Sequence, residues 1–91
     1  MALSVAGGGG TTICKSVGGN STLYTVPAGK TFEGYIWNTS SNGPGYINGT
    51  RLYWPYSNSY FVHERMYVQL NSGDEVLGDT SGTTMILGVE K

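Results

Sequence analysis

The stretch TFEGYIWN, residues 31–38, decides the fold class that this chain is expected to adopt. Side chains point alternately to the two faces of an extended strand, so Phe32 and Ile36 share one face while Tyr35 and Trp37 share the other. Aromatic and β-branched residues of this kind favour strands. The stretch therefore predicts a β-strand with an apolar inner face and an aromatic outer face.

Similar short apolar runs occur on both sides of this stretch, separated by clusters of Gly, Pro, Asn and Ser. The runs cover residues 11–17, 21–26, 46–54, 60–70, 74–78 and 83–90. No segment of helical length shows the apolar spacing of an amphipathic helix without a Gly or Pro inside it. We expect an all-β protein, an antiparallel β-sandwich of jelly-roll type with about seven or eight short strands.

The domain is expected to span residues 11–91, preceded by a flexible N-terminal arm at residues 1–10 that ends in Gly7–Gly10. Gly18-Gly19-Asn20 is expected to turn a hairpin between the first two strands. Pro27 is expected at the second position of a turn, and the fourth strand is expected to kink at Asn48-Gly49.

Alternation also assigns the core and an outer surface. The residues predicted to contribute to the core are Phe32, Ile36, Leu52, Met66, Val68, Leu70, Val76, Ile86 and Leu87. The opposite faces combine aromatic residues with arginine, which is the composition of protein interface hot spots. The interface candidates are Tyr35, Trp37, Arg51, Tyr53, Arg65 and Tyr67. In the arm, apolar Met1, Leu3 and Val5 are candidates for attachment to a neighbouring protein.

Charge excludes several partners. The formal net charge is −1, and only 12% of residues are charged. The five cationic residues lie far apart, so no footprint for nucleic acid and no polybasic membrane patch is expected. No run approaches the ~20 apolar residues of a membrane span, and no signal peptide is evident, so synthesis in a cytoplasm is expected.

The fragments that resemble phosphate-binding and zinc-binding motifs are incomplete. Gly29-Lys30-Thr31 resembles the end of a phosphate-binding loop, but Tyr24 stands where its first glycine is needed and a strand follows instead of a helix. His63-Glu64 lacks the second histidine of a zinc-protease helix, and His63 is the only histidine in the chain. We therefore expect no metal site, no cofactor and no catalytic residues.

Two weaker possibilities for chemistry remain. Cys14 and His63 could meet in space as a nucleophile pair, although a half-buried structural Cys14 is favoured, and a lone cysteine forms no internal disulfide. A carboxylate pair for glycoside hydrolysis could come from the acidic side chains of Glu33, Glu64, Asp74, Glu75 and Asp79. Asp74, however, is expected to cap a turn, and Glu75 and Asp79 are expected to be solvated.

Two segments carry a family resemblance. LYTVPAGKTF at residues 23–32 and VQLNSGDEV at residues 68–76, with the apolar final strand at residues 85–89, resemble small β-sandwich proteins of tailed bacteriophage particles. The resemblance implies a jelly-roll-like homotrimer located in the virion. It implies the role of a capsid decoration (cement) protein bound to the major capsid protein or another virion protein, or of a tail-fibre tip. It brings no catalytic residues with it.

The expected function is therefore that of a non-enzymatic structural virion protein, most simply a trimeric capsid decoration protein. The alternative is a carbohydrate-binding or receptor-binding module that contacts a cell-surface glycan. Tyrosine and tryptophan faces beside Asn and Asp side chains suit the stacking and hydrogen bonding that a sugar offers.

Overall fold

The computed structural model describes residues 10–39, 43–53 and 65–91, and every regular element within these ranges is a β-strand. The eight strands are β1 (Thr11–Gly18), β2 (Thr22–Thr25), β3 (Phe32–Asn38), β4 (Tyr46–Ile47), β5 (Thr50–Arg51), β6 (Met66–Leu70), β7 (Glu75–Leu77) and β8 (Thr83–Glu90). The described ranges hold no helix that is long and apolar enough to cross a membrane. The all-β prediction is confirmed.

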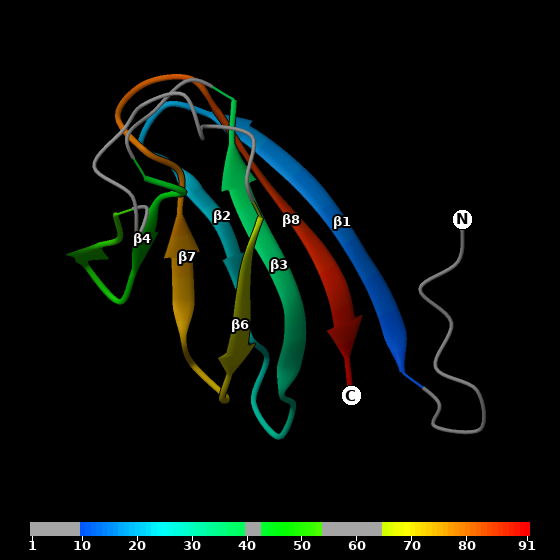
Figure 1. Cartoon of the computed structure of the whole chain (residues 1–91). Helices are drawn as coiled ribbons and strands as arrows, with labels where there is room; N and C mark the ends of the chain where they lie inside the picture. Colours follow the sequence, from blue (N-terminus) through cyan, green and yellow to red (C-terminus); the bar gives the residue numbers. More distant parts are fainter. Residues whose placement is uncertain (1–9, 40–42, 54–64) are drawn as a thin grey trace.

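The strands form two antiparallel sheets of four strands each, in the orders β1-β8-β3-β6 and β2-β7-β4-β5. Figure 1 shows β1, β8 and β3 running side by side as long strands, with β2 and β7 in the second layer. Apart from β4 and β5, consecutive strands belong to different sheets. The hairpin expected at Gly18-Gly19-Asn20 is therefore wrong, because this turn carries the chain from one sheet to the other. The jelly-roll connectivity stays a prediction.

Two other turns also differ from expectation. Asn48 and Gly49 do not kink a single strand but turn a tight hairpin between β4 and β5, with positive φ angles of 51° and 82°. Two consecutive positive φ angles are the requirement of the hairpin turn for which Asn-Gly is the preferred sequence. Pro27 occupies the first position of its turn rather than the second, since Lys30 N donates to the Pro27 carbonyl at 3.1 Å.

The core lies between the two sheets. Its buried members are Phe32, Ile36, Val68, Leu70 and Ile86 from one sheet and Leu23, Tyr24, Val26 and Val76 from the other sheet and its flank. Leu52 and Met66 pack against this cluster while partly exposed, as their predicted core role requires. Leu87 does not join it: on β8, Ile86 faces the core and Leu87 faces outward. The prediction that Leu87 contributes to the core is therefore wrong, because its neighbour Ile86 occupies the inward position on β8.

Two glycines face each other at the centre of the β1-β8-β3-β6 sheet. Gly34 on β3 pairs directly with Gly88 on β8, and both point into the core. A Cβ on Gly88 would lie 2.7 Å from the Gly34 Cα and would overlap the tip of the Phe32 ring. The ring, which is 2% exposed, thus occupies the space that two side chains would otherwise fill. Both positions require glycine for packing rather than for backbone freedom.

A buried polar network closes one end of the sandwich. The Asn38 side chain donates to Thr84 Oγ1 at 2.8 Å and to the Ser81 carbonyl at 3.1 Å, and the Thr84 hydroxyl donates to the Pro44 carbonyl at 3.0 Å. The Asp79 backbone N–H donates to the same Thr84 oxygen at 3.0 Å. Since Asn38, Thr84 and Asp79 are 0% exposed, these bonds replace those that water would make.

The glycine pair generates the first prediction. Gly88→Ala should lower the free energy of unfolding by about 2–3 kcal/mol, because the added methyl group overlaps the Phe32 ring and the Glu33 carbonyl, which sits in the β-ladder. Gly18→Ala, in the neighbouring edge strand with open space around its Cβ, is the matched control and should change stability by less than about 0.5 kcal/mol. Urea unfolding measures both, and equal costs would contradict the packing described here.

Candidate functional site

The outer face of the β1-β8-β3-β6 sheet is the candidate functional surface, hereafter the outer face. Strand register arranges its side chains in rows across the four strands. The central row is Cys14, Leu87, Tyr35 and Tyr67. One flanking row is Ser16, Met85 and Trp37, and the other is Thr12, Val89, Glu33 and Gln69. The two inner strands of the sheet thus supply mainly apolar groups, and the two edge strands supply mainly polar ones.

Aromatic side chains dominate the exposed part of this face. Tyr35 and Tyr67 are 40% and 48% exposed, and their rings meet in an edge-to-face arrangement with centroids 5.6 Å apart. The Arg65 guanidinium lies over the Trp37 ring, 5.0 Å from its centroid. Such pairs hold the rings in defined positions, so the face presents a preorganised aromatic surface.

A polar group adjoins the aromatic pair. The Tyr67 hydroxyl donates a short hydrogen bond to Glu33 Oε2, and the Gln69 side chain is within hydrogen-bonding reach of the same phenol. The hydrogen bond to the Glu33 carboxylate, aided by its negative charge, raises the pKa of Tyr67 above the ordinary value for tyrosine. Tyr67, Glu33 and Gln69 therefore form a connected polar triad on the outer face.

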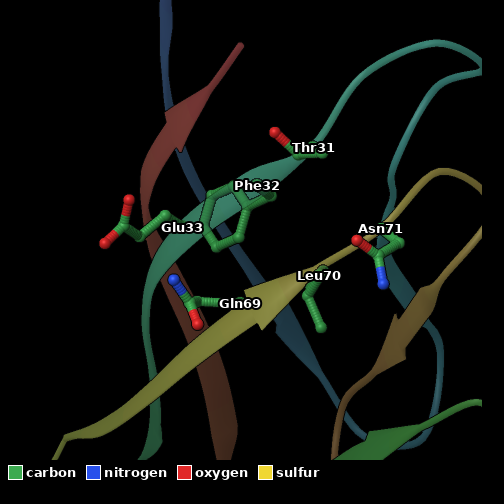
Figure 2. A pocket seen from close by; sticks show the side chains of 6 residues that line it. All are labelled: Thr31, Phe32, Glu33, Gln69, Leu70 and Asn71. Atoms are coloured by element: carbon green, nitrogen blue, oxygen red, sulfur yellow. The ribbon is translucent and has the colours of Figure 1, made fainter.

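Two depressions lie at opposite ends of the outer face. One, of about 440 Å³, is lined by Thr31, Phe32, Glu33, Gln69, Leu70 and Asn71. Figure 2 shows Glu33 and Gln69 extending to the same side from β3 and β6, with Thr31 just before β3 and Asn71 just after β6. The other, of about 210 Å³, is lined by Cys14, Lys15, Ser16, Trp37, Met85 and Ile86. The first is mainly polar and the second mainly apolar.

The six interface candidates do not form one cluster. Tyr35, Trp37, Arg65 and Tyr67 lie together on the outer face, as their alternation predicts. Arg51 lies on β5, at the edge of the other sheet, and Tyr53 follows it two residues later. The Arg51 guanidinium lies 5.2 Å from the Tyr53 ring centroid and forms an ion pair of 3.1 Å with Asp79.

The expectation from the sequence that Asp79 is solvated is wrong. Its carboxylate is not solvated but 0% exposed, where it accepts from Arg51 and from the Thr80 backbone N–H at 2.6 Å. The Asp79 charge raises the pKa of Arg51 above its ordinary value. This pair ties the β4–β5 hairpin to the loop before β8, and sequence spacing alone carries no signal for it, because 28 residues separate the partners.

Two further expectations concern the turn at Asp74 and the burial of Cys14. Asp74 caps its turn as predicted: its carboxylate accepts from the Asn71 N–H at 2.8 Å and from the Asn48 amide at 3.0 Å, and these bonds lower the pKa of Asp74. Cys14 is exposed on the outer face, so the expectation of a half-buried cysteine is wrong. It lies on an edge strand whose outward side chains have no covering layer among the described residues.

Several sequence candidates lie outside the described residues. They are Met1, Leu3 and Val5 of the arm, and His63 with Glu64. Within residues 10–39, 43–53 and 65–91, no three His, Cys, Asp or Glu side chains gather as metal ligands would.

Comparison with protein-family models, curated proteins and solved structures gives no match to this chain.

The triad generates the second prediction. The pKa of Tyr67 should lie above the ordinary value for tyrosine and fall back toward about 10 in Glu33→Gln, which removes the carboxylate that accepts the hydrogen bond of its hydroxyl group. A raised tyrosine pKa stabilises the fold below pH 10 and loses that contribution as pH rises through the folded-state value. NMR titration of the tyrosine ring signals measures this shift. Glu75→Gln on the other sheet is the control, and an unchanged Tyr67 pKa in Glu33→Gln would contradict the triad.

Proposed function

We propose that this protein is a non-enzymatic structural module that assembles into a homotrimer and decorates a bacteriophage capsid. The observation that carries the proposal is the outer face, an aromatic and apolar surface with a polar rim. Interface hot spots are built in this way, from Tyr, Trp and Arg near the centre and polar groups around them.

The size of the apolar surface suits association. Tyr35 and Tyr67 still expose 40% and 48% of their surface. Burying the remainder of the Tyr35 ring would remove roughly 60–100 Å² from water, which contributes on the order of 2 kcal/mol at about 25 cal/mol per Å² before association costs. Half-buried Trp37, Met85 and Leu87 beside them would add to this.

Charge favours a second copy of the chain as the occupant of this face. Glu33 lies at one end of β3, and Arg65 lies over Trp37 at the other end. A surface that carries both signs can find the opposite sign on a copy of itself, which complementary association requires. Closure into a ring keeps such contacts from propagating into fibres.

The virion role draws on the two motifs that resemble phage particle proteins. In the fold they contact each other: Val26 N donates to the Asp74 carbonyl at 3.0 Å, Gly73 N donates to the Val26 carbonyl at 2.9 Å, and Ser72 Oγ donates to the Lys30 carbonyl at 2.7 Å. The two segments thus act as one unit at the base of the sandwich. This arrangement supports treating the resemblance as a single structural feature, with a jelly-roll type of connectivity as part of the proposal.

The third prediction tests self-assembly. Gel filtration with light scattering should report a mass of about three chains. Leu87→Gln should weaken association at least tenfold, equivalent to about 1.4 kcal/mol, because it places an amide in the apolar row of the outer face. Thr25→Gln, at an exposed position of β2 in the other sheet, should leave the mass unchanged. A stable monomer of the unaltered chain at micromolar concentration would overturn the trimer.

The fourth prediction tests decoration. Purified protein added to phage capsids that lack it should co-sediment with them, and removal of residues 1–10 should weaken this binding without changing the far-ultraviolet circular dichroism spectrum. The reason is that the apolar Met1, Leu3 and Val5 are proposed to attach the sandwich to the shell. Full binding by the shortened protein would remove the arm from the mechanism, and no binding by either form would overturn the capsid role.

A further inference from the structure

The polar depression at the end of β3 and β6 lies at the rim of the surface that the assembly role uses, and its hydrogen-bonding groups, apart from the Glu33 charge, have no part in that role. It is lined by Thr31, Glu33, Gln69 and Asn71 around the nearly buried Phe32 and Leu70, and is defined here as the Glu33 hollow. It opens at the opposite end of the outer face from Trp37 and Met85. A subunit that packs over Trp37 and Met85 would leave this end at the rim of the contact.

Hydrogen-bonding capacity is concentrated in this hollow. The Glu33 carboxylate has about four acceptor positions and uses one for the Tyr67 hydroxyl. Gln69 and Asn71 each bring a carbonyl acceptor and an amide donor, and Thr31 brings a hydroxyl that serves as either. Because Glu33 and Gln69 are directly paired across the two strands, their side chains extend to the same side of the sheet (Figure 2).

A flat apolar surface adjoins these groups. The Tyr67 hydroxyl is bonded to Glu33, so the exposed Tyr67 ring stands beside the hollow, and its edge-to-face contact with Tyr35 fixes its plane. One side of a ligand in the hollow can therefore rest on an aromatic ring while its edge reaches the Glu33 carboxylate and the Gln69 carboxamide.

The ligand that matches both halves of this site has a face of C–H groups and an edge of hydroxyl groups. A pyranose sugar is of this kind. The only charged side chain among the described residues that line the hollow is Glu33, which disfavours phosphorylated, sulfated and carboxylated ligands. We infer that the Glu33 hollow, together with the Tyr67 ring, is a binding site for a neutral pyranose at the end of a glycan.

Such a site gives the assembly a second contact. If three copies associate through the outer face, three hollows lie on one particle-bound unit, and weak single-site affinity is multiplied by simultaneous binding. Shallow polar sites of this size bind a single sugar weakly, so a dissociation constant in the millimolar range is expected, equivalent to about −4 kcal/mol.

The experiment is an NMR titration of the ¹⁵N-labelled full chain with three named probes. They are methyl α-D-glucopyranoside, methyl β-D-galactopyranoside and N-acetyl-D-glucosamine, each raised to about 50 mM so that millimolar binding is saturated. At least one probe should shift the backbone amides at residues 31–33 and 69–71, and leave those of β2 and β7 unmoved. No saturable shift with any probe, or shifts located elsewhere, would overturn the inference.

Variants separate the site from general surface effects. Glu33→Ala should weaken binding of the active probe at least fivefold, and Gln69→Ala should do the same, because each removes a group that lines the hollow. Glu75→Gln, on the other sheet, should leave binding unchanged. Acetyl-lysine methylamide is the competing probe. If it shifts the same amides and the sugars do not, the hollow is a site for a cationic peptide, and the saccharide assignment is wrong.

The result of the sugar titration is distinguishable from the test of the trimer. The oligomeric mass is measured on the same sample by light scattering, so a trimer without sugar binding and a sugar-binding monomer are distinct results. Only the sugar titration bears on the Glu33 hollow.

Discussion

The contact of the Phe32 ring with the paired glycines Gly34 and Gly88 is the constraint on which the rest of the sandwich depends. Two central strands without inward side chains at this point would leave a void in the core, and one aromatic ring fills it. The pairing also fixes register, since a slip of one residue between β3 and β8 would bring a Cβ into the ring. Once this register is set, Tyr35 and Leu87 are forced outward, and the aromatic outer face follows.

The two ends of the molecule are stabilised by different kinds of interaction. At one end, buried Asn38, Thr84 and Asp79 satisfy each other and the nearby backbone, and Arg51 supplies the opposite charge. Removing one member would leave a buried donor or charge without its partner, which costs more than the bond itself contributes. At the other end, turn bonds such as Ser72 with the Lys30 carbonyl are exposed and individually weak.

The outer face unites the two proposals. Its apolar centre suits contact with another copy of the chain, and its Glu33 end combines a carboxylate, carboxamides and an exposed ring. A surface that is apolar in the middle and polar at one end can be partly covered by assembly while the polar end still meets a ligand. A thin, glycine-rich core of this size also benefits from association, because subunit contacts add buried area that a chain of 91 residues cannot supply alone.

By itself the sequence determined the all-β class, the positions of β1, β2, β3, β7 and β8 within a few residues, and the faces of β3 and β6, because the period of two is a local property of extended backbone. It also placed Tyr35, Trp37, Arg65 and Tyr67 on one outer surface, although it grouped Arg51 and Tyr53 with them. Only the tertiary structure decided which strands pair, that Arg51 and Tyr53 belong to the other sheet, and that Asp79 is buried. It also decided that Ile86 rather than Leu87 faces the core, since Gly88, two residues after Ile86 on the same face of β8, is held inward by the Phe32 contact. These are relations between residues distant in the chain, and no local pattern of side chains encodes them.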